Sequence, residues 1–206
     1  MAIKRKTSEK KAKKKPDKSK SDKKLAESRK KESEKNTIKA LFTGENVISN
    51  TKEAISLYSQ SRFGELKQGK IVYSIVEALY LIEKKKMTLY FDRKKLNFEK
   101  LIDFAKQKNK RIRTKYLVFR DMRNRGFIVK TALKFGAEFR IYARGIKPGE
   151  DHAKWILYPV SENQELTWHD FSAKNRVAHS TKKNLLIGIV DEEEDVTYYE
   201  ISWTKP

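Results

Sequence analysis

The chain has 206 residues and a formal net charge of +21, with 48 Lys and Arg against 27 Asp and Glu. Such a charge makes a compact state repel itself unless a polyanion or a partner offsets it, so nucleic acid is the first candidate ligand. There is no cysteine, which excludes thiolate metal sites, disulfides and thiol nucleophiles. No apolar run approaches the roughly 20 residues of a membrane-spanning helix, so we expect a soluble, unexported, cytoplasmic protein.

Residues 1–36 form a low-complexity Lys/Ser/Glu segment with 16 Lys and Arg, 6 Asp and Glu and no aromatic residue. This composition cannot bury a core, so we predict a disordered Lys-rich tail. Every Phe, Trp and Tyr lies in the rest of the chain. The folded body is expected to begin at Thr37.

The first part of the body, residues 37–110, is predicted to be a small α/β domain. Ser74-x-x-Glu77 has the spacing of a capping box, and apolar residues recur at helical spacing behind it, which predicts a helix over 74–85. A second helix is expected over 98–107. The basic stretch 106–113 then indicates a boundary near residue 110.

The second part, residues 111–206, is predicted to be a mixed sheet with flanking helices. Helices are expected over 116–125, with Gly126 as the C-terminal cap, and over 170–182. β-Branched and aromatic residues predict strands over 127–130, 139–142, 154–160, 185–190 and 196–203. The fold class is therefore α+β.

Two groups of residues could carry chemistry or assembly. His152 stands apart from the other histidines because it follows the loop Gly145–Gly149 and precedes a predicted strand. The acidic run Asp191–Asp195 lies between two predicted strands and is typical of a hairpin turn. It could serve as an electrostatic docking element, as a metal site of a metal-dependent nuclease, or for solubility alone.

RNA carries its own nucleophile, the 2′-hydroxyl. Cleavage without a metal therefore needs only a base, an acid for the 5′-oxygen and a cation for the charged transition state. Tyr, His and Lys side chains can fill these roles. Composition does not choose among the nine tyrosines.

Residues 116–206 contain five local signatures: FRDMRNRGFIVK, FGAEFRIYARG, EDHAKW, RVAHSTKK and VDEEEDVTYYE. With these signatures, residues 116–206 resemble the catalytic half of archaeal tRNA-intron splicing endonucleases, and the region around IVEALYLIEKKKM resembles their N-terminal half more loosely. The resemblance implies a nuclease-like C-terminal catalytic domain over 111–206 and a single-repeat catalytic subunit.

The resemblance implies a catalytic set of Tyr142, His152 and Lys183. Tyr142 would take the proton of the 2′-hydroxyl, His152 would protonate the departing 5′-oxygen, and Lys183 would stabilise the transition state. The neighbouring Lys182 is the alternative for the lysine. A free tyrosine has a pKa of about 10, so its use as a base needs nearby positive charge, for which Lys183 and Arg144 are the candidates.

The substrate would be precursor tRNA, cut at bulge-helix-bulge sites by a lyase-type transesterification without metal or cofactor. Products would carry 2′,3′-cyclic phosphate and 5′-hydroxyl ends. The resemblance also places a flipped bulge base between Arg176 and Trp203. The alternatives are a solvated helix face for Arg176 and packing for Trp203.

The family resemblance further implies a tetramer in which an acidic loop of one subunit enters a basic groove of another. The corresponding residues are Asp191, Glu192, Glu193, Glu194 and Asp195. We expect a homotetramer, because this chain carries both halves and the acidic turn. The alternatives are pairing with another subunit and a non-catalytic RNA-binding subunit of such a complex.

Overall fold

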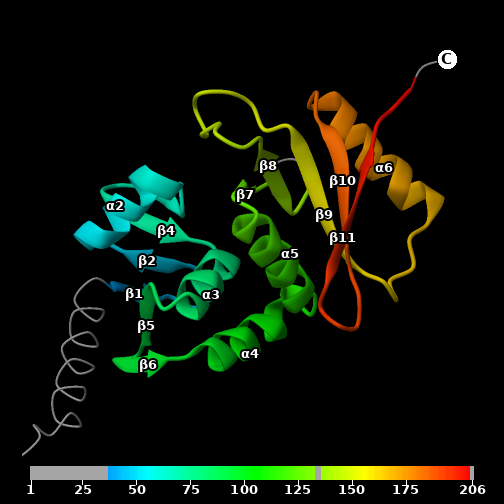
Figure 1. Ribbon diagram of the computed structural model, residues 1–206. Helices are drawn as coiled ribbons and strands as arrows, with labels where there is room; N and C mark the ends of the chain where they lie inside the picture. The colour runs from blue at the N-terminus through cyan, green and yellow to red at the C-terminus, as the bar shows by residue number, and fades with distance from the viewer. Residues whose placement is uncertain (1–36, 133–135, 205–206) are drawn as a thin grey trace, which may run out of the picture. The chain divides into compact units, whose positions relative to one another are not determined.

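The computed structural model describes residues 37–132 and 136–204. Within these residues the chain forms five helices and eleven strands, which make two sheets (Figure 1). The predicted tail, residues 1–36, lies outside the described part. The described residues belong to one compact unit.

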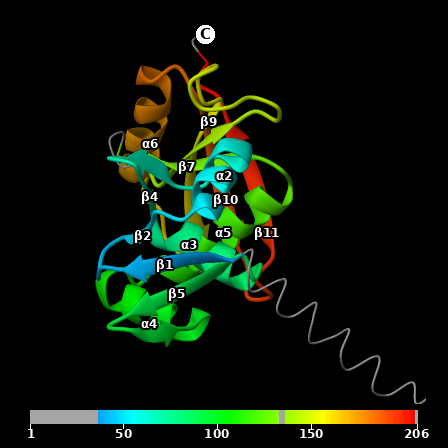
Figure 2. The same ribbon diagram turned by 90° about the vertical axis from the view of Figure 1, so that its left-hand side faces the viewer.

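The first sheet has six strands in the order β3-β4-β2-β1-β5-β6. Strands β1 and β5 are parallel, and every other neighbouring pair in this sheet is antiparallel. Figure 2 shows β1, β2 and β4 side by side. The elements of this half are β1 Ile38–Phe42, β2 Val47–Ser49, α2 Lys52–Ser61, β3 Glu65–Lys67, β4 Lys70–Tyr73, α3 Ile75–Glu83, β5 Met87–Phe91, β6 Lys94–Leu96 and α4 Phe98–Lys108.

Helix α3 begins where the Ser74-x-x-Glu77 spacing predicts it to begin. The Glu77 carboxylate accepts hydrogen bonds from the Ser74 backbone N–H and from the Ser74 hydroxyl, both at 2.9 Å. The apolar stripe faces the core as predicted, with Ala78 and Leu79 fully buried. The helix ends two residues before the predicted 85, because Lys85 adopts a left-handed φ of 55°.

Glu77 also links the first half of the chain to the second. Its other carboxylate oxygen accepts from the Gly64 N–H at 2.8 Å and lies 3.7 Å from Lys130 Nζ on β7. The Lys130 ammonium donates to the Gly64 carbonyl, and burial lowers the pKa of Lys130 against the opposing attraction of Glu77. A side chain at residue 64 would collide with Ile71, and φ there is +72°, so glycine is required at this junction.

Helix α5 spans Ile112–Asn124 and begins four residues before the predicted start at 116. The basic stretch 106–113, which overlaps the start of α5, was expected to mark a domain boundary. Ile112 within that stretch is buried in the core. Its neighbours Arg111 and Arg113 are exposed, so their charges do not interrupt the helix.

The predicted division near residue 110 falls in the short connection between α4 and α5. Buried residues from both sides of this connection share one hydrophobic core, which runs from Ile38 to Val190. The separation into domains 37–110 and 111–206 stays a prediction.

The C-terminal end of α5 confirms the predicted cap. Gly126 has a left-handed φ of 87°, its N–H donates to the Arg123 carbonyl, and the Phe127 N–H donates to the Met122 carbonyl, both at 3.1 Å. This pair of bonds is the Schellman arrangement, in which glycine ends a helix and turns the chain. The turn leads directly into β7.

The second sheet has five strands in the order β11-β10-β9-β8-β7. Strands β9 and β10 are parallel, and the other neighbours are antiparallel. This confirms the predicted mixed sheet and the α+β class; β8 has the predicted bounds. The elements are β7 Ile128–Thr131, β8 Phe139–Tyr142, β9 Trp155–Ser161, α6 Trp168–Ser180, β10 Asn184–Val190 and β11 Val196–Ile201.

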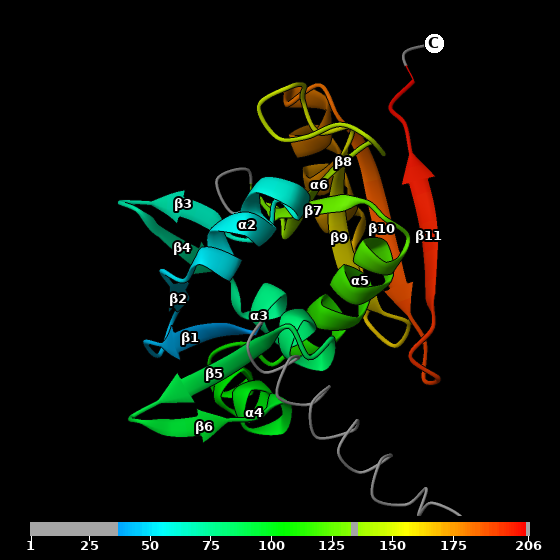
Figure 3. The same ribbon diagram turned by 60° about the vertical axis from the view of Figure 1, so that its left-hand side comes forward.

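Helices cover both faces of the second sheet, with α5 on one side and α6 on the other (Figure 3). Leu186 of β10 belongs to the core shared with α5. Leu185 and Ile187 pack instead with Ala178 of α6. This alternation follows from strand geometry, because successive side chains point to opposite faces.

Candidate active site

One edge of the second sheet gathers the end of β8 and the beginnings of β9 and β10. The backbone N–H of Lys154 donates to the Ile141 carbonyl at 2.9 Å, and the N–H of Asn184 donates to the Lys154 carbonyl at 3.0 Å. Strand β8 is antiparallel to β9, and β9 is parallel to β10, so these three chain positions meet at the same edge. The edge is fixed by backbone bonds.

The three residues predicted to be catalytic lie within two positions in the chain of the residues that make these backbone hydrogen bonds. Tyr142 directly follows Ile141, His152 precedes Lys154 by two residues, and Lys183 directly precedes Asn184. The fold therefore brings Lys183 to the same edge as Tyr142 and His152, which lie more than 30 residues earlier in the sequence.

Tyr142 is the last residue of β8 and is 5% exposed. Ile141 points into the core shared with α5, so Tyr142 points to the opposite face. The buried polar atoms without a hydrogen-bond partner include the hydroxyls of Tyr73 and Tyr116 but not that of Tyr142. Tyr142 thus combines a buried ring with a position at the end of its strand.

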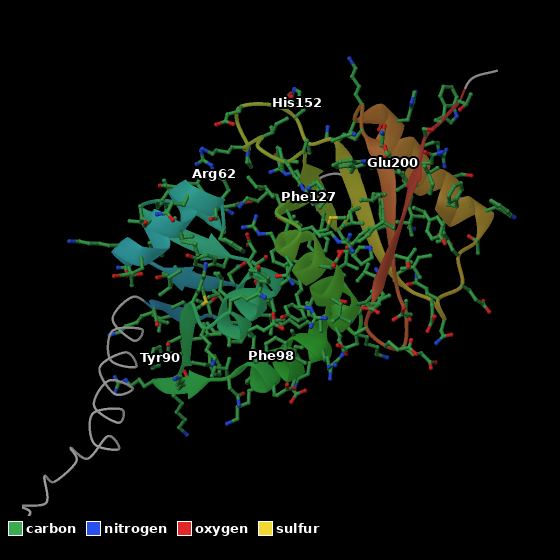
Figure 4. The ribbon with its side chains drawn as sticks, viewed as in Figure 1. Arg62, Tyr90, Phe98, Phe127, His152 and Glu200 are labelled. Atoms are coloured by element: carbon green, nitrogen blue, oxygen red, sulfur yellow. The ribbon has the colours of Figure 1, made fainter. Side chains whose placement is uncertain are left out.

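His152 lies in the loop between β8 and β9 and is exposed (Figure 4). Its backbone N–H donates to Asp151 Oδ1 at 2.6 Å, and a β-bridge joins Pro148 to Asp151 within the loop. The next residue, Ala153, is buried and anchors the loop to the body. The predicted loop is confirmed. The imidazole of His152 is open to solvent, while the buried Ala153 holds the adjacent backbone in place.

The connection from α6 to β10 distinguishes the two candidate lysines. Lys182 adopts a left-handed φ of 56°, is exposed, and its N–H donates to the His179 carbonyl at 2.9 Å. The Lys183 N–H donates to the Ala178 carbonyl at 2.9 Å, and its ammonium donates to the Thr181 carbonyl at 2.7 Å. Lys183 is partly buried, whereas Lys182 occupies the turning position of the helix cap.

A hollow of about 190 Å³ opens beside this connection. Lys183 and Trp203 both line it, and the Trp203 ring lies 4.6 Å from the His179 ring, centroid to centroid. Arg176 is exposed on α6 and is not among the lining residues. Trp203 thus lines the same hollow as both candidate lysines, Lys182 and Lys183, and its ring contact is with His179.

His179 was given no role at the sequence level. The signal that could have found it is its place in RVAHSTKK, three residues after Arg176, which puts both residues near one face of α6. Trp203, whose ring is tilted by 49° against that of His179, follows β11 and is 56% exposed.

The acidic run forms the predicted hairpin turn, since β10 and β11 pair as far as Val190 and Val196. Asp191 stabilises this turn, because its Oδ1 accepts from the Asp195 N–H at 2.8 Å. Glu194 accepts from Arg113 Nε of α5 at 2.8 Å. The turn lies at the opposite end of β10 from Lys183.

Glu192, Glu193 and Asp195 of this turn are exposed. Among residues 37–132 and 136–204, no group of three or more His, Asp or Glu side chains is arranged to hold a metal ion. Across the same ranges, no helix is long and apolar enough to cross a lipid bilayer.

Two family models match the chain: the N-terminal domain of tRNA intron endonuclease over residues 38–102 and the catalytic C-terminal domain of tRNA intron endonuclease over residues 112–198. Together they cover most of the folded body. The chain belongs to the tRNA intron endonuclease family. The family resemblance inferred from the local motifs is thereby confirmed, and the match begins after the Lys-rich segment.

Curated relatives of this family are similar over most of their length. The tRNA-splicing endonuclease of Thermococcus onnurineus is 41% identical over 172 residues, which is 83% of this chain and 99% of that protein. The tRNA-splicing endonuclease of Methanothermobacter thermautotrophicus is 41% identical over 159 residues, 77% of this chain and 92% of that protein. That of Nanoarchaeum equitans is 40% identical over 138 residues, 64% and 88% respectively.

The tRNA intron endonuclease catalytic-domain match contains Tyr142, His152, Lys183 and the acidic turn. Trp203 lies beyond its last matched residue, 198. A role of Trp203 in RNA binding therefore needs evidence from this chain itself.

Proposed function

We propose that this protein is a tRNA-intron endonuclease that cleaves precursor tRNA at bulge-helix-bulge sites by transesterification. The observation that carries the proposal is that one edge of the second sheet gathers the end of β8 and the beginnings of β9 and β10. Tyr142, His152 and Lys183 each lie within two residues of the backbone hydrogen bonds that join these strands there. Membership of the tRNA intron endonuclease family supports the same activity.

In the proposed reaction, Tyr142 accepts the proton of the 2′-hydroxyl while the 2′-oxygen attacks the adjacent phosphorus. The bond from phosphorus to the 5′-oxygen breaks, and His152 donates a proton to that oxygen. Lys183 stabilises the extra negative charge on the phosphoryl oxygens. The products are a 2′,3′-cyclic phosphate and a 5′-hydroxyl, and atoms and charges balance without a metal or cofactor.

The environment of each side chain fits its role. Exposure leaves His152 free to approach the leaving group, and a cap with two backbone bonds fixes the start of β10 at Lys183. We assign the lysine to Lys183, because it is partly buried and directly precedes β10, whereas Lys182 is exposed. Trp203 beside Lys183 supports stacking with a bulged base, with Arg176 as the second planar group.

Assembly as a homotetramer is part of the same proposal. The exposed carboxylates Glu192 and Glu193 would enter a basic groove of another copy. A groove that suits them is a hollow of about 480 Å³, whose lining includes Lys84, Lys86 and Arg123. Two active sites held at a fixed separation would then cut the two bulges of one precursor.

The test is cleavage of a bulge-helix-bulge RNA by the purified chain in the presence of EDTA, followed by end-group analysis. We expect cleavage, with 5′-hydroxyl ends that accept phosphate from a kinase and 3′ ends that resist phosphatase until the cyclic phosphate is opened. A matched RNA with a 2′-deoxy nucleotide at each cut site should stay intact, because it lacks the nucleophile.

Two results would contradict the proposal. Loss of cleavage in EDTA with recovery by a divalent cation would indicate metal-dependent hydrolysis. Binding of the intact RNA without any cleavage would indicate a non-catalytic subunit, and addition of a separate catalytic chain would then restore cutting.

A further inference from the structure

Arg140 lies on the same face of β8 as Tyr142. The two residues are two apart in the strand, and the residue between them, Ile141, points into the core. The guanidinium carbon of Arg140 is 5.9 Å from the centroid of the Tyr142 ring. This is within the distance at which a cation is attracted to an aromatic face.

The positive charge of Arg140 has no anionic contact in residues 37–132 and 136–204. Its Nε is sealed from water and has no hydrogen-bond acceptor there. Glu65 is the carboxyl group whose pKa Arg140 helps to lower, but the hydrogen bond from Lys67 is the largest cause, and Glu65 pairs with Lys67 at 3.0 Å. A buried donor without a partner is rare in proteins.

Two other cations of this sheet have contacts of their own. Lys130 on β7 is the cross-strand partner of Arg140, but its ammonium contacts Glu77 and the Gly64 carbonyl. Lys183 donates to the Thr181 carbonyl.

Two further cations and one imidazole flank the same edge. Arg144 lies over the Phe127 ring at 4.9 Å, and Lys154 lies over the Trp155 ring at 4.5 Å. His152 is exposed on the loop. The sequence-based hypothesis named Lys183 and Arg144 as the sources of positive charge, and this stays a prediction. Arg140 is a further cation, placed over the Tyr142 ring.

We propose that Arg140 is a positioning residue for Tyr142, which holds the ring in place and stabilises its phenolate form. The inference rests on the proposed function, in which Tyr142 is the base. A phenolate carries negative charge that spreads into the ring, so a guanidinium over that ring favours the ionised form. Arg140 itself neither gains nor loses a proton and does not touch the RNA.

The test compares pH–rate profiles of single-turnover cleavage for the wild type and for Arg140→Gln, Arg140→Met, Arg140→Lys and Arg144→Gln. For a base, the rate rises with pH as the phenolate forms. We expect Arg140→Gln and Arg140→Met to lower the rate at neutral pH by about 3- to 30-fold and to move the rising limb to higher pH, with KM unchanged. Arg140→Lys keeps a cation and should recover part of the rate.

Arg144→Gln is the matched control, because it removes an arginine that lies over a different ring. It should leave the rising limb in place. An independent readout is the ultraviolet absorbance of phenolate during alkaline titration, taken as the difference between each protein and its Tyr142→Phe version. Tyr142 should ionise at higher pH in Arg140→Met than in the wild type.

Three outcomes would overturn the inference. The rising limb and the phenolate titration could both stay unchanged in Arg140→Gln and Arg140→Met. Arg140→Lys could shift the rising part of the pH–rate profile as far as Arg140→Gln does. A raised KM with weaker salt dependence and an unmoved limb would make Arg140 a phosphate contact. Full activity of Tyr142→Phe is a separate result, because it would reject Tyr142 as the base and with it the proposed function.

Discussion

The two ends of the second sheet carry opposite charge. At one end, Lys154 and Lys183 flank the beginnings of β9 and β10. At the other end, β10 and β11 are joined by the acidic turn Asp191–Asp195. Strand β10 spans seven residues between them, Asn184–Val190, which corresponds to roughly 20 Å at about 3.3 Å per residue.

In the proposed function, β10 separates the residues assigned to chemistry from those assigned to assembly. The lysine end has backbone bonds that fix three chain positions, and the acidic end has a turn stabilised by Asp191. Sites more than about 10 Å apart usually act independently on stability. A substitution at one end is therefore not expected to disturb the folding of the other end.

The largest effect is expected from Tyr142→Phe at the chemical end. Removing the hydroxyl removes the base, so single-turnover cleavage should fall by about 10²- to 10⁴-fold. Affinity for a bulge-helix-bulge RNA, measured by filter binding, should stay unchanged, as should the mass measured by light scattering. Wild-type cleavage by this variant would remove Tyr142 from the site.

A smaller loss of activity is expected from Lys183→Ala, with Lys182→Ala as the adjacent control. Loss of a cation that stabilises the transition state should lower kcat by about 10²- to 10³-fold. The exposed Lys182 should affect only affinity and its salt dependence. The reverse pattern of kcat values would transfer the role to Lys182.

Substitutions in the acidic turn are expected to change self-association rather than the rate of the chemical step. Glu192→Gln combined with Glu193→Gln is expected to weaken self-association by about 10-fold or more, because a basic groove loses its anionic partner. Light scattering across a dilution series measures this change.

Controls for the acidic end come from the same surface. The double change Glu162→Gln and Glu165→Gln removes the same charge from an exposed loop and should leave the mass unchanged. Glu194→Gln should weaken assembly less than the Glu192 and Glu193 changes, because Glu194 is paired with Arg113 of its own chain. An unchanged mass in the Glu192 and Glu193 variant would reject the docking role.

The sequence alone determined the local structure and the residues proposed for chemistry. The Ser74-x-x-Glu77 spacing located α3, and Gly126 located the end of α5, because caps depend on side chains close in sequence. The family motifs named Tyr142, His152 and Lys183.

Only the tertiary structure decided which distant groups meet. Glu77 contacts Lys130 across the junction, and Glu194 contacts Arg113. Trp203 contacts His179, a residue to which the sequence analysis gave no role. Such contacts depend on strand order and on helix placement, which no local pattern specifies.

The cation beside Tyr142 was open to prediction from strand alternation but was missed. Residues two apart in a strand share a face, which favours Arg140, whereas Arg144 lies beyond the end of β8. The positive charge near Tyr142 was instead expected from Lys183 and Arg144. Burial of Ile141 turns both Arg140 and Tyr142 to the opposite face of the sheet, which is the observation behind the proposed role of Arg140.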